Sequence, residues 1–195
     1  MRNLLIILVA IFLFSCIEEH KNTKLTGTVF GTSYSIIYDS DVNYEIQFDS
    51  LFYIINKSMS TYQVNSDISK LNRNESFEID EHFIKVYDVS KEIFGQTEGA
   101  FDPSIGNVVN AWKFGAEDTI EVVDSLKIDS LMQYVGYDKT YRHNNTIRKS
   151  NPNVYIEFNA IAKGYGVDVI GEFLESQKVN NYLVEIGGEI RVKGI

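Results

Sequence analysis

The chain has 195 residues, and 44% of them are hydrophobic, which suffices for one full-sized core but not comfortably for two. Eighteen basic residues against twenty-seven acidic ones give a formal net charge of −9, and no run of Lys or Arg interrupts the acidic excess. Because phosphate backbones are bound by clustered basic side chains, this charge excludes nucleic acid from the expected partners.

The first sixteen residues, MRNLLIILVAIFLFSC, have the composition of an export signal. Arg2 supplies a basic start, and an apolar run extends from Leu4 to Phe14. This run is shorter than the ~20 residues that an α-helix needs to span a bilayer. Residues 1–15 are therefore predicted to be a signal peptide that is removed on export.

Cys16, the single cysteine, follows that run after one small residue. The LFSC ending resembles a bacterial lipoprotein box, in which the cysteine is lipidated. A lone thiol exported to an oxidising compartment also favours a cysteine that is chemically consumed. The alternative is an uncleaved anchor with an incidental buried cysteine. We expect a lipoprotein anchored on the periplasmic side of the inner or outer membrane, with a tether at residues 16–24 and one domain at residues 25–195.

Residues 28–59 change in pattern from a strand to a helix. TVFGTSYSIIY, residues 28–38, is rich in strand-forming residues, and Gly31 is placed for a bulge or a close backbone approach. Apolar residues then recur at steps of three and four from Phe48 to Met59, which predicts an amphipathic helix within residues 44–59.

A second helix is predicted after Asp80, which is placed to cap it, and this helix ends near Gly95. The stretch GAFDPSIGNVVNAWKFG follows at residues 99–115. Pro103 suits the first position of a helix, and Asp102 before it is a preferred N-cap residue. The simplest interpretation of this stretch is therefore a capped helix start.

The last third of the chain alternates helices and strands. The predicted elements are a helix near Val123–Tyr134, a hairpin turning at Asn144–Asn145, a strand at NVYIEFNA (153–160), a helix at residues 160–177 and a final strand at residues 181–195 broken by two glycines. Three glycines in the helix cost ~1 kcal/mol each, so a ligand or backbone is expected against that face. The predicted fold class is α+β, a mixed sheet with flanking helices.

Four stretches carry the functional signal: TVFGTSY, MSTYQVNSDISKLN, GAFDPSIGNVVNAWKFG, and EFNAIAKGYGVD followed by YLVEIGGEIRVKG. In this order they resemble the ApbE family, the FAD:protein FMN transferases. The resemblance runs from residue 28 to residue 194. Family members continue beyond the GG strand, whereas this sequence stops at Ile195. The resemblance thus implies an ApbE-like, T-fold-related domain that is incomplete at the C-terminus.

Members of that family bind FAD and Mg²⁺, cut the pyrophosphate, and attach FMN to a Thr or Ser of a target flavoprotein while releasing AMP. Phe30 stands where the family often has methionine, and Glu157 where an Asp is usual. Ala160 stands where a backbone carbonyl ligates the metal. The FAD-binding residues that the resemblance implies are Phe30, Tyr62, Ala100, Phe101, Asp102, Glu157 and Lys163.

These residue types also suit a dinucleotide on physical grounds. Aromatic side chains such as Tyr62, Phe101 and Trp112 can stack on a flat ring. Lys163 would offset the charge of a pyrophosphate, and the start of its helix offers N–H donors to an anion. Each residue also has a plainer explanation: a core aromatic for Tyr62 and Trp112, a solvated lysine, and an Asp102 that only caps a helix.

Three functions remain open from the sequence. The first is the transferase, the second is a Mg²⁺-dependent FAD pyrophosphatase that releases FMN and AMP to water, and the third is a truncated, non-catalytic flavin-binding lipoprotein. The family places its acidic and threonine metal ligands in the C-terminal part that is absent here. The final strand is predicted to form an unpaired apolar edge that favours aggregation.

Overall fold

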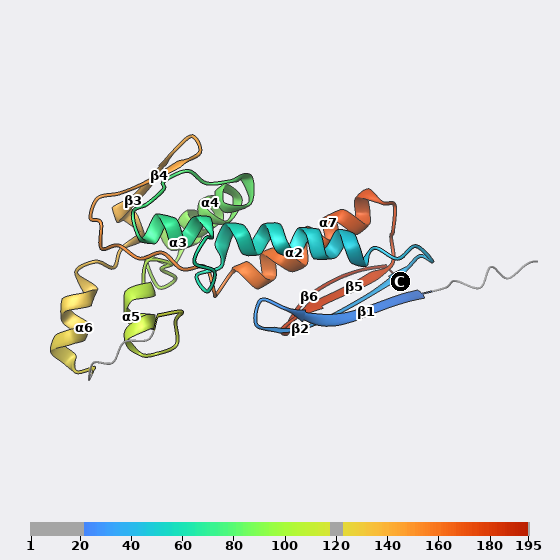
Figure 1. Cartoon of the computed structure of the whole chain (residues 1–195), viewed down its shortest axis with the longest axis horizontal. Coiled ribbons are helices and arrows are strands. Elements are labelled where there is room, and N and C mark those ends of the chain that lie inside the picture. Colours follow the sequence, from blue (N-terminus) through green and yellow to red (C-terminus); the bar gives the residue numbers. More distant parts are fainter. Residues whose placement is uncertain (1–21, 118–122, 195) are drawn as a thin grey trace, which may run out of the picture.

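The computed structural model describes residues 22–117 and 123–194. Figure 1 shows a sheet at one end of the molecule, α5 and α6 at the other, and a long helix, α2, running from one toward the other. The α+β class predicted from the sequence is confirmed. The elements within these ranges are β1 (Asn22–Val29), β2 (Thr32–Asp39), α2 (Glu45–Met59), α3 (Asp67–Asn72), α4 (Glu81–Gln96), α5 (Gly106–Ala111), α6 (Ser125–Met132), the 3₁₀ helix η1 (Tyr137–Lys139), β3 (Thr140–His143), β4 (Thr146–Lys149), α7 (Ala162–Ser176), β5 (Tyr182–Ile186) and β6 (Glu189–Lys193).

The larger sheet has the strand order β1-β2-β5-β6, and each neighbouring pair among these described strands is antiparallel. The mixed sheet predicted from the sequence is therefore wrong for this part of the chain. Two tight turns account for two of the three antiparallel pairs, β1–β2 and β5–β6, because a two-residue turn joins antiparallel strands. Phe30 and Gly31 form the first turn, with φ angles of 53° and 75°, so this position is a hairpin and not a bulge. Gly187 and Gly188 form the second, as the predicted break in the last strand.

The first strand starts earlier than the sequence suggested. β1 begins at Asn22, inside the segment assigned to a tether at residues 16–24. Its residues pair with β2 along the whole length of both strands, from Asn22 opposite Asp39 to Val29 opposite Thr32. The polar composition of Asn22–Lys24 hid this strand, because an exposed edge strand needs few apolar side chains.

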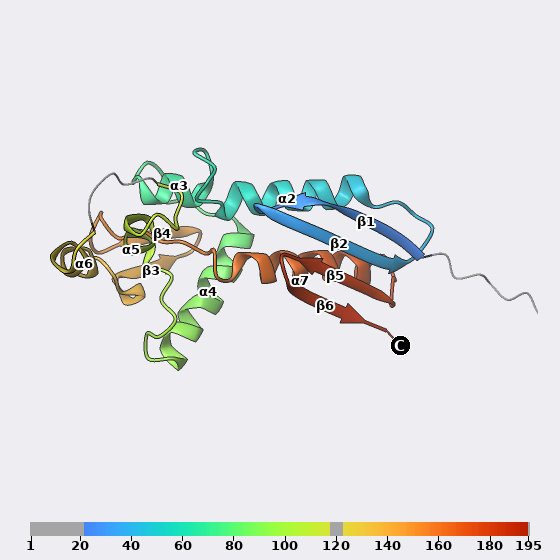
Figure 2. The same ribbon diagram turned by 90° about the horizontal axis from the view of Figure 1, so that it is seen from below.

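Helices α2 and α7 cover one face of the sheet (Figures 1 and 2). Ile36 of β2 and Val184 of β5 are fully buried beneath Ile170 of α7 and Phe48 of α2 in one apolar cluster. The amphipathic helix predicted at residues 44–59 is confirmed as α2. Burial of such a layer supplies the main free energy of folding for this end of the molecule.

A second core lies beneath α4, which crosses the direction of α2 and α7 (Figure 2). Phe83 and Tyr87 of α4 pack there against Phe158 and Tyr137. The predicted cap is confirmed, because the Asp80 carboxylate accepts a hydrogen bond from the backbone N–H of Phe83 at 2.8 Å. The predicted hairpin at Asn144–Asn145 is confirmed as β3 and β4.

The segment NVYIEFNA is not a sheet strand, although the sequence predicted one. Val154, Ile156 and Phe158 are buried in alternation, as in a strand. Within the described residues, this segment forms an isolated β-bridge between Tyr155 and Ile105. Asn72 of α3 instead donates from its side-chain amide to the Ile156 carbonyl and accepts from the Ile156 N–H, at 2.8 and 2.9 Å. Side chains thus satisfy backbone groups that a neighbouring strand would otherwise pair.

An ion-pair network fastens β6 to α7. Arg191 lies 2.9 Å from Asp168 and 2.8 Å from Glu175, and Lys193 lies 2.9 Å from Glu175. Tyr182 of β5 donates its hydroxyl to the same Glu175 carboxylate at 2.6 Å. Hydrogen bonds from Tyr182, Lys193 and Arg191 lower the pKa of Glu175 from 4.5 to about 2.

This network predicts an acid-labile part of the folding free energy. The folded-state pKa of Glu175 is lowered, so its contribution is fully present above its unfolded pKa of 4.5 and is lost as the pH falls toward about 2. We expect Glu175→Gln to flatten the pH dependence of thermal unfolding between these values. Calorimetry of both proteins across this range tests the prediction, and identical slopes would contradict it.

The face of the sheet opposite α2 and α7 is exposed at β6, which is an edge among the described strands. Ile190 and Val192 on this strand are 61% and 63% exposed. A charged side chain on an edge strand opposes pairing with another chain. We therefore expect Ile190→Lys to reduce self-association, as measured by light scattering. Gln47→Lys adds the same charge on α2, and equal effects of the two changes would show that net charge alone matters.

Candidate functional site

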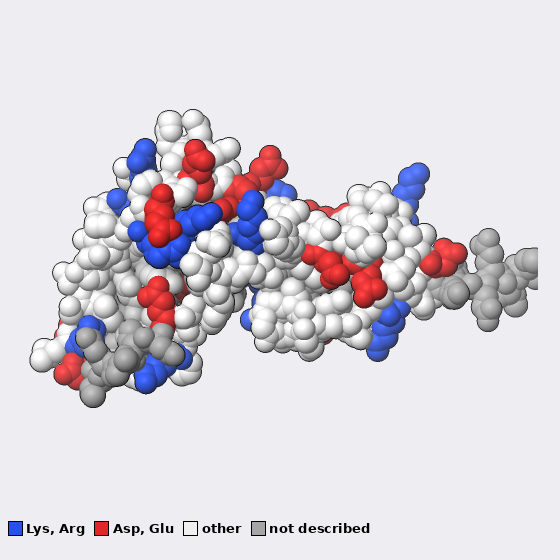
Figure 3. Space-filling model, viewed as in Figure 1, with Lys and Arg blue, Asp and Glu red and all other residues white. Residues whose placement is uncertain are grey.

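A cavity of about 790 Å³ opens between the sheet and the part of the molecule that carries α5. Figure 3 shows the surface hollowed there, with mostly uncharged side chains around the hollow on the face in view. The β1–β2 turn, the end of α2, the segment after α2 and the start of α7 contribute to its walls. It is lined by Phe30, Gly31, Ile55, Asn56, Met59, Ser60, Tyr62, Gln63, Phe114, Asn159, Ala162 and Lys163. We call this the first cavity.

Phe30 reaches the first cavity because its turn packs closely on α7. Its ring makes an edge contact with Phe52 of α2, with ring centroids 5.7 Å apart. A Cβ atom on Gly166 of α7 would lie 2.7 Å from the Phe30 ring, closer than real contacts allow. The sequence predicted a ligand or backbone against the glycines of this helix. At Gly166 the structure places an aromatic side chain instead.

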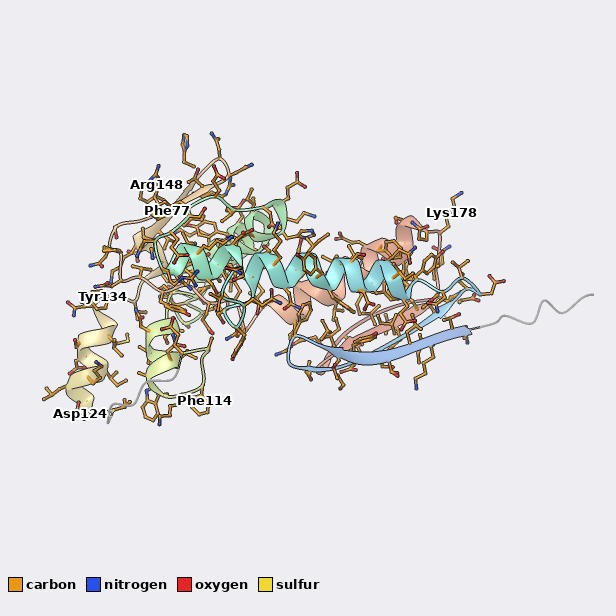
Figure 4. The ribbon with its side chains drawn as sticks, viewed as in Figure 1. Phe77, Phe114, Asp124, Tyr134, Arg148 and Lys178 are labelled. Atoms are coloured by element: carbon orange, nitrogen blue, oxygen red, sulfur yellow. The ribbon has the colours of Figure 1, made fainter. Side chains whose placement is uncertain are left out.

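Two exposed aromatic side chains stand at the first cavity. Tyr62 is 63% exposed and Phe114 is 77% exposed. Figure 4 shows Phe114 on the loop that follows α5. This exposure rules out the plainer explanation of Tyr62 as a core aromatic side chain. Sequence reasoning missed Phe114 and named Trp112 from the same WKF stretch, yet Trp112 lines neither this cavity nor the second one.

A second cavity, of about 480 Å³, holds the other predicted residues. It is lined by Phe94, Gly99, Ala100, Phe101, Asp102, Pro103, Ile105, Met132, Val135, Glu157, Phe158, Ala160 and Ile161. The predicted binding residues thus divide between two cavities, with Phe30, Tyr62 and Lys163 in the first. The segment Glu157–Lys163 contributes to both cavities. We call this segment the shared wall.

Asp102 does not cap a helix, and the sequence prediction on this point is wrong. Helix α5 begins at Gly106, with Ile105 at its N-cap position and no side-chain cap. Asp102 instead accepts hydrogen bonds from the N–H and the hydroxyl of Ser104, at 2.8 and 2.6 Å. The Ser104 hydroxyl in turn accepts from the Gly136 N–H at 2.6 Å. The aspartate therefore fixes a turn that lines the second cavity, because Asp readily bonds to backbone two residues on.

Glu157 and Lys163 place opposite charges on the shared wall. Burial raises the pKa of Glu157, although a hydrogen bond from the Asn159 side chain opposes this rise. Its backbone N–H donates to the Pro103 carbonyl at 2.8 Å, which joins the wall to the Asp102 turn. Lys163 lies in the first turn of α7 and is the charged residue among the described residues that line the first cavity. A lysine at a helix N-terminus favours an anion there.

The described residues do not assemble a metal centre from side chains. Among them, no group of three or more His, Cys, Asp or Glu residues is placed to hold a metal ion. Ala160, the predicted source of a carbonyl ligand, is exposed and lines the second cavity. One carbonyl falls far short of the six oxygen ligands that Mg²⁺ takes.

The geometry defines an α+β domain with two cavities, both of which are lined in part by the segment that leads into the start of α7. Comparison with known proteins agrees with this class. Residues 30–195 match the ApbE family, so the chain belongs to that family.

Two relatives are named FAD:protein FMN transferase. The protein from Vibrio cholerae is 35% identical over 207 residues, which cover 100% of this chain and 62% of the relative. The protein from Haemophilus influenzae is 35% identical over 209 residues, covering 98% and 60%. A solved structure of the flavin transferase ApbE from Vibrio cholerae superposes with a TM-score of 0.85 at 34% identity, covering 90% of this chain and 60% of that one. The chain thus spans about 60% of the length of these relatives.

The contact between Gly166 and Phe30 predicts that alanine at position 166 lowers the stability of the protein, although alanine normally stabilises a helix relative to glycine. Alanine favours a helix over glycine by ~1 kcal/mol, but overpacking a core position costs about 1–3 kcal/mol. We expect Gly166→Ala to lower the free energy of unfolding and to displace Phe30 from the first cavity. Gly95→Ala in α4 is the matched control, because its added Cβ meets nothing within 4 Å. Equal stability changes in both variants, measured by urea unfolding, would refute this account.

Proposed function

We propose that the chain acts as, or is part of, an FAD:protein FMN transferase. It binds FAD across the two cavities and transfers FMN to a Thr or Ser hydroxyl of a target flavoprotein, with release of AMP. The observation that carries this proposal is that all seven predicted FAD-binding residues line one or the other of two cavities that have the shared wall in common. The names of the relatives support the same reaction.

FAD is an extended molecule with a flat ring system at each end and a pyrophosphate between them. Tyr62 and Phe114 offer exposed aromatic faces at the first cavity, and the half-buried Phe101 lines the second. Stacking on such a face adds about 0.5–1.5 kcal/mol beyond the burial of area. Lys163 and the first turn of α7 lie at the wall that both cavities share, where the pyrophosphate would cross.

The reaction exchanges the phosphoanhydride bond of FAD for a phosphoester bond to the target hydroxyl. The hydroxyl oxygen of the target forms a bond to the phosphorus on the FMN side, the pyrophosphate P–O bond breaks, AMP leaves, and the hydroxyl proton is released. Phosphoryl transfer depends mostly on positioning and charge neutralisation. Lys163 supplies positive charge beside the proposed path of the pyrophosphate. Mg²⁺, expected from the family resemblance with Ala160 as a carbonyl ligand, would add charge neutralisation when bound.

Aromatic stacking makes a direct prediction for FAD affinity. Tyr62→Ala and Phe114→Ala should each weaken FAD binding about two- to tenfold, as expected from the loss of 0.5–1.5 kcal/mol. Fluorescence titration of the 195-residue chain measures this. Tyr53→Ala is the matched control, since Tyr53 is 65% exposed on α2 and lines neither cavity. Unchanged affinity in both cavity variants would count against FAD in the first cavity.

Asp102 is tested by two substitutions that separate its roles. Asp102→Ala removes the acceptor for Ser104 and should cost about 1 kcal/mol of stability. Asp102→Asn keeps an acceptor oxygen for that turn but lacks the carboxylate charge. If the carboxylate contacts FAD, the Asn variant should retain wild-type stability and bind FAD more weakly. Equal FAD affinity of the Asn variant and the wild type would show that the carboxylate has no part in binding.

Transfer itself is assayed with FAD, Mg²⁺ and a target flavoprotein, using the 195-residue chain and a form extended to the length of the relatives. We expect covalent flavin fluorescence on the target with the extended form only, because the described residues gather no side-chain metal ligand set. AMP release without a labelled target would indicate hydrolysis in place of transfer. Comparable transfer by both forms would show that the metal site lies within the 195 residues.

We further propose that the chain is exported and anchored through lipidated Cys16, which lies outside the described residues. In the part of the chain that the structure covers, no helix has the length and apolar character needed to cross a membrane. Mass spectrometry of the membrane fraction should find lipid on Cys16 and no leader. An unmodified Cys16 on an intact leader would overturn this proposal, and Cys16→Ser provides the unlipidated control.

A further inference from the structure

The side chain of Lys149, at the end of β4, binds three backbone carbonyls from two separate segments. Its Nζ donates to the carbonyl of Asn72, the last residue of α3, at 3.1 Å. It also donates to the carbonyls of Pro152 and Val154, both at 3.0 Å. An ammonium group has three protons to donate, so these contacts use its full capacity.

These contacts clamp the chain between α3 and the shared wall. Asn72 offers its own carbonyl to Lys149 while its side-chain amide pairs with both the N–H and the carbonyl of Ile156. Residues 152–156 are thereby tied to the C-terminal end of α3 by two side chains. We call residues 150–156 the clamped loop. It takes no place in either sheet.

The clamped loop leads directly into the binding residues. Glu157 follows it in the chain and lines the second cavity, and Asn159 lines the first. Phe158 between them is fully buried against Phe83 of α4. A shift of the loop would therefore move the start of the shared wall.

The electrostatics of this cation are unusual for a surface lysine. Burial lowers the pKa of Lys149 from 10.5 to about 8, so the group is still mostly protonated at neutral pH. Its hydrogen bonds go to carbonyl dipoles, one of them at the negative end of helix α3, where a cation is favoured. Lys149 held in this way supplies three fixed donors to the backbone carbonyls at this place.

We propose that Lys149, together with Asn72, is a positioning residue that fixes the clamped loop and thereby sets the shared wall for binding of the dinucleotide. The part of this inference that concerns the ligand rests on the proposed function. The part that concerns the loop does not depend on any ligand. The two parts are therefore tested by separate measurements.

Hydrogen exchange on the chain without ligand tests the loop. The N–H of Ile156 is bonded to Asn72, and the N–H of Glu157 to Pro103. We expect Lys149→Met to accelerate exchange at both amides roughly tenfold or more, because local opening becomes easier. The matched control is Lys91→Met, since Lys91 also donates to two backbone carbonyls, those of Tyr137 and Thr140, and contacts no part of the loop.

Unchanged exchange at Ile156 and Glu157 in Lys149→Met, or equal acceleration in Lys91→Met, would overturn the proposal. If the Met variant does not fold, Lys149→Gln is used, because it keeps two donors on a shorter side chain. The Gln variant should show the same local acceleration to a smaller degree. Asn72→Ala should reproduce the pattern, since it removes the other half of the clamp.

Titration with FAD then tests the consequence for binding. We expect Lys149→Met to weaken FAD affinity roughly tenfold while Lys91→Met leaves it within about twofold, with similar losses of thermal stability in both. Accelerated exchange with unchanged FAD affinity would overturn the link from the loop to the ligand. A wild-type chain that binds no FAD would refute the proposed function, and the exchange result would still decide the role of Lys149 in the loop.

Discussion

The close packing of the β1–β2 turn on α7 is the constraint on which the candidate site depends. It joins the sheet to the helix whose first turn carries Lys163, and it brings Phe30 to the first cavity. The contact needs two backbone features at once. Phe30 must adopt a left-handed conformation, with φ of 53°, and Gly166 opposite must lack a side chain. A cleft wall built from a turn and a glycine is rigid because neither side has room to move.

The clamped loop, which leads into the shared wall, is held by a different kind of interaction. No strand supports the clamped loop along its length, and polar side chains from α3 and β4 satisfy its backbone in place of a ladder. Further amides act in the same way, as Asn107 donates to the Asn153 carbonyl at 2.7 Å and Asn74 to the Pro152 carbonyl at 3.2 Å. Such bonds orient a loop as firmly as a sheet does, but each depends on a single side chain.

The sequence predicted the elements whose signals are local. Periodicity identified α2, the Asp80 cap identified the start of α4, and paired glycines located the β5–β6 turn. It failed where a local pattern has two tertiary explanations. Alternating burial is the same in a strand and in an extended loop packed on a core, so residues 153–160 were misassigned. Asp102 before Pro103 is equally suited to a helix cap and to a turn.

The candidate site was predicted as a set of residues but not as a shape. The family motifs gave seven positions, and the structure divides them between two cavities. Phe114 was not predicted because only the path of the loop after α5 decides which aromatic side chain of that stretch faces the cavity.

The pairing of β2 with β5, with Tyr34 opposite Ile186, has a consequence for the rate of folding. Contacts between residues so distant in sequence give a high contact order, and the entropy of closing that long loop must be paid before the central pair of strands can form. During synthesis β2 could therefore not pair with β5 until Tyr182–Ile186 had been made, and the apolar face of the β1–β2 hairpin would stay exposed to water until then.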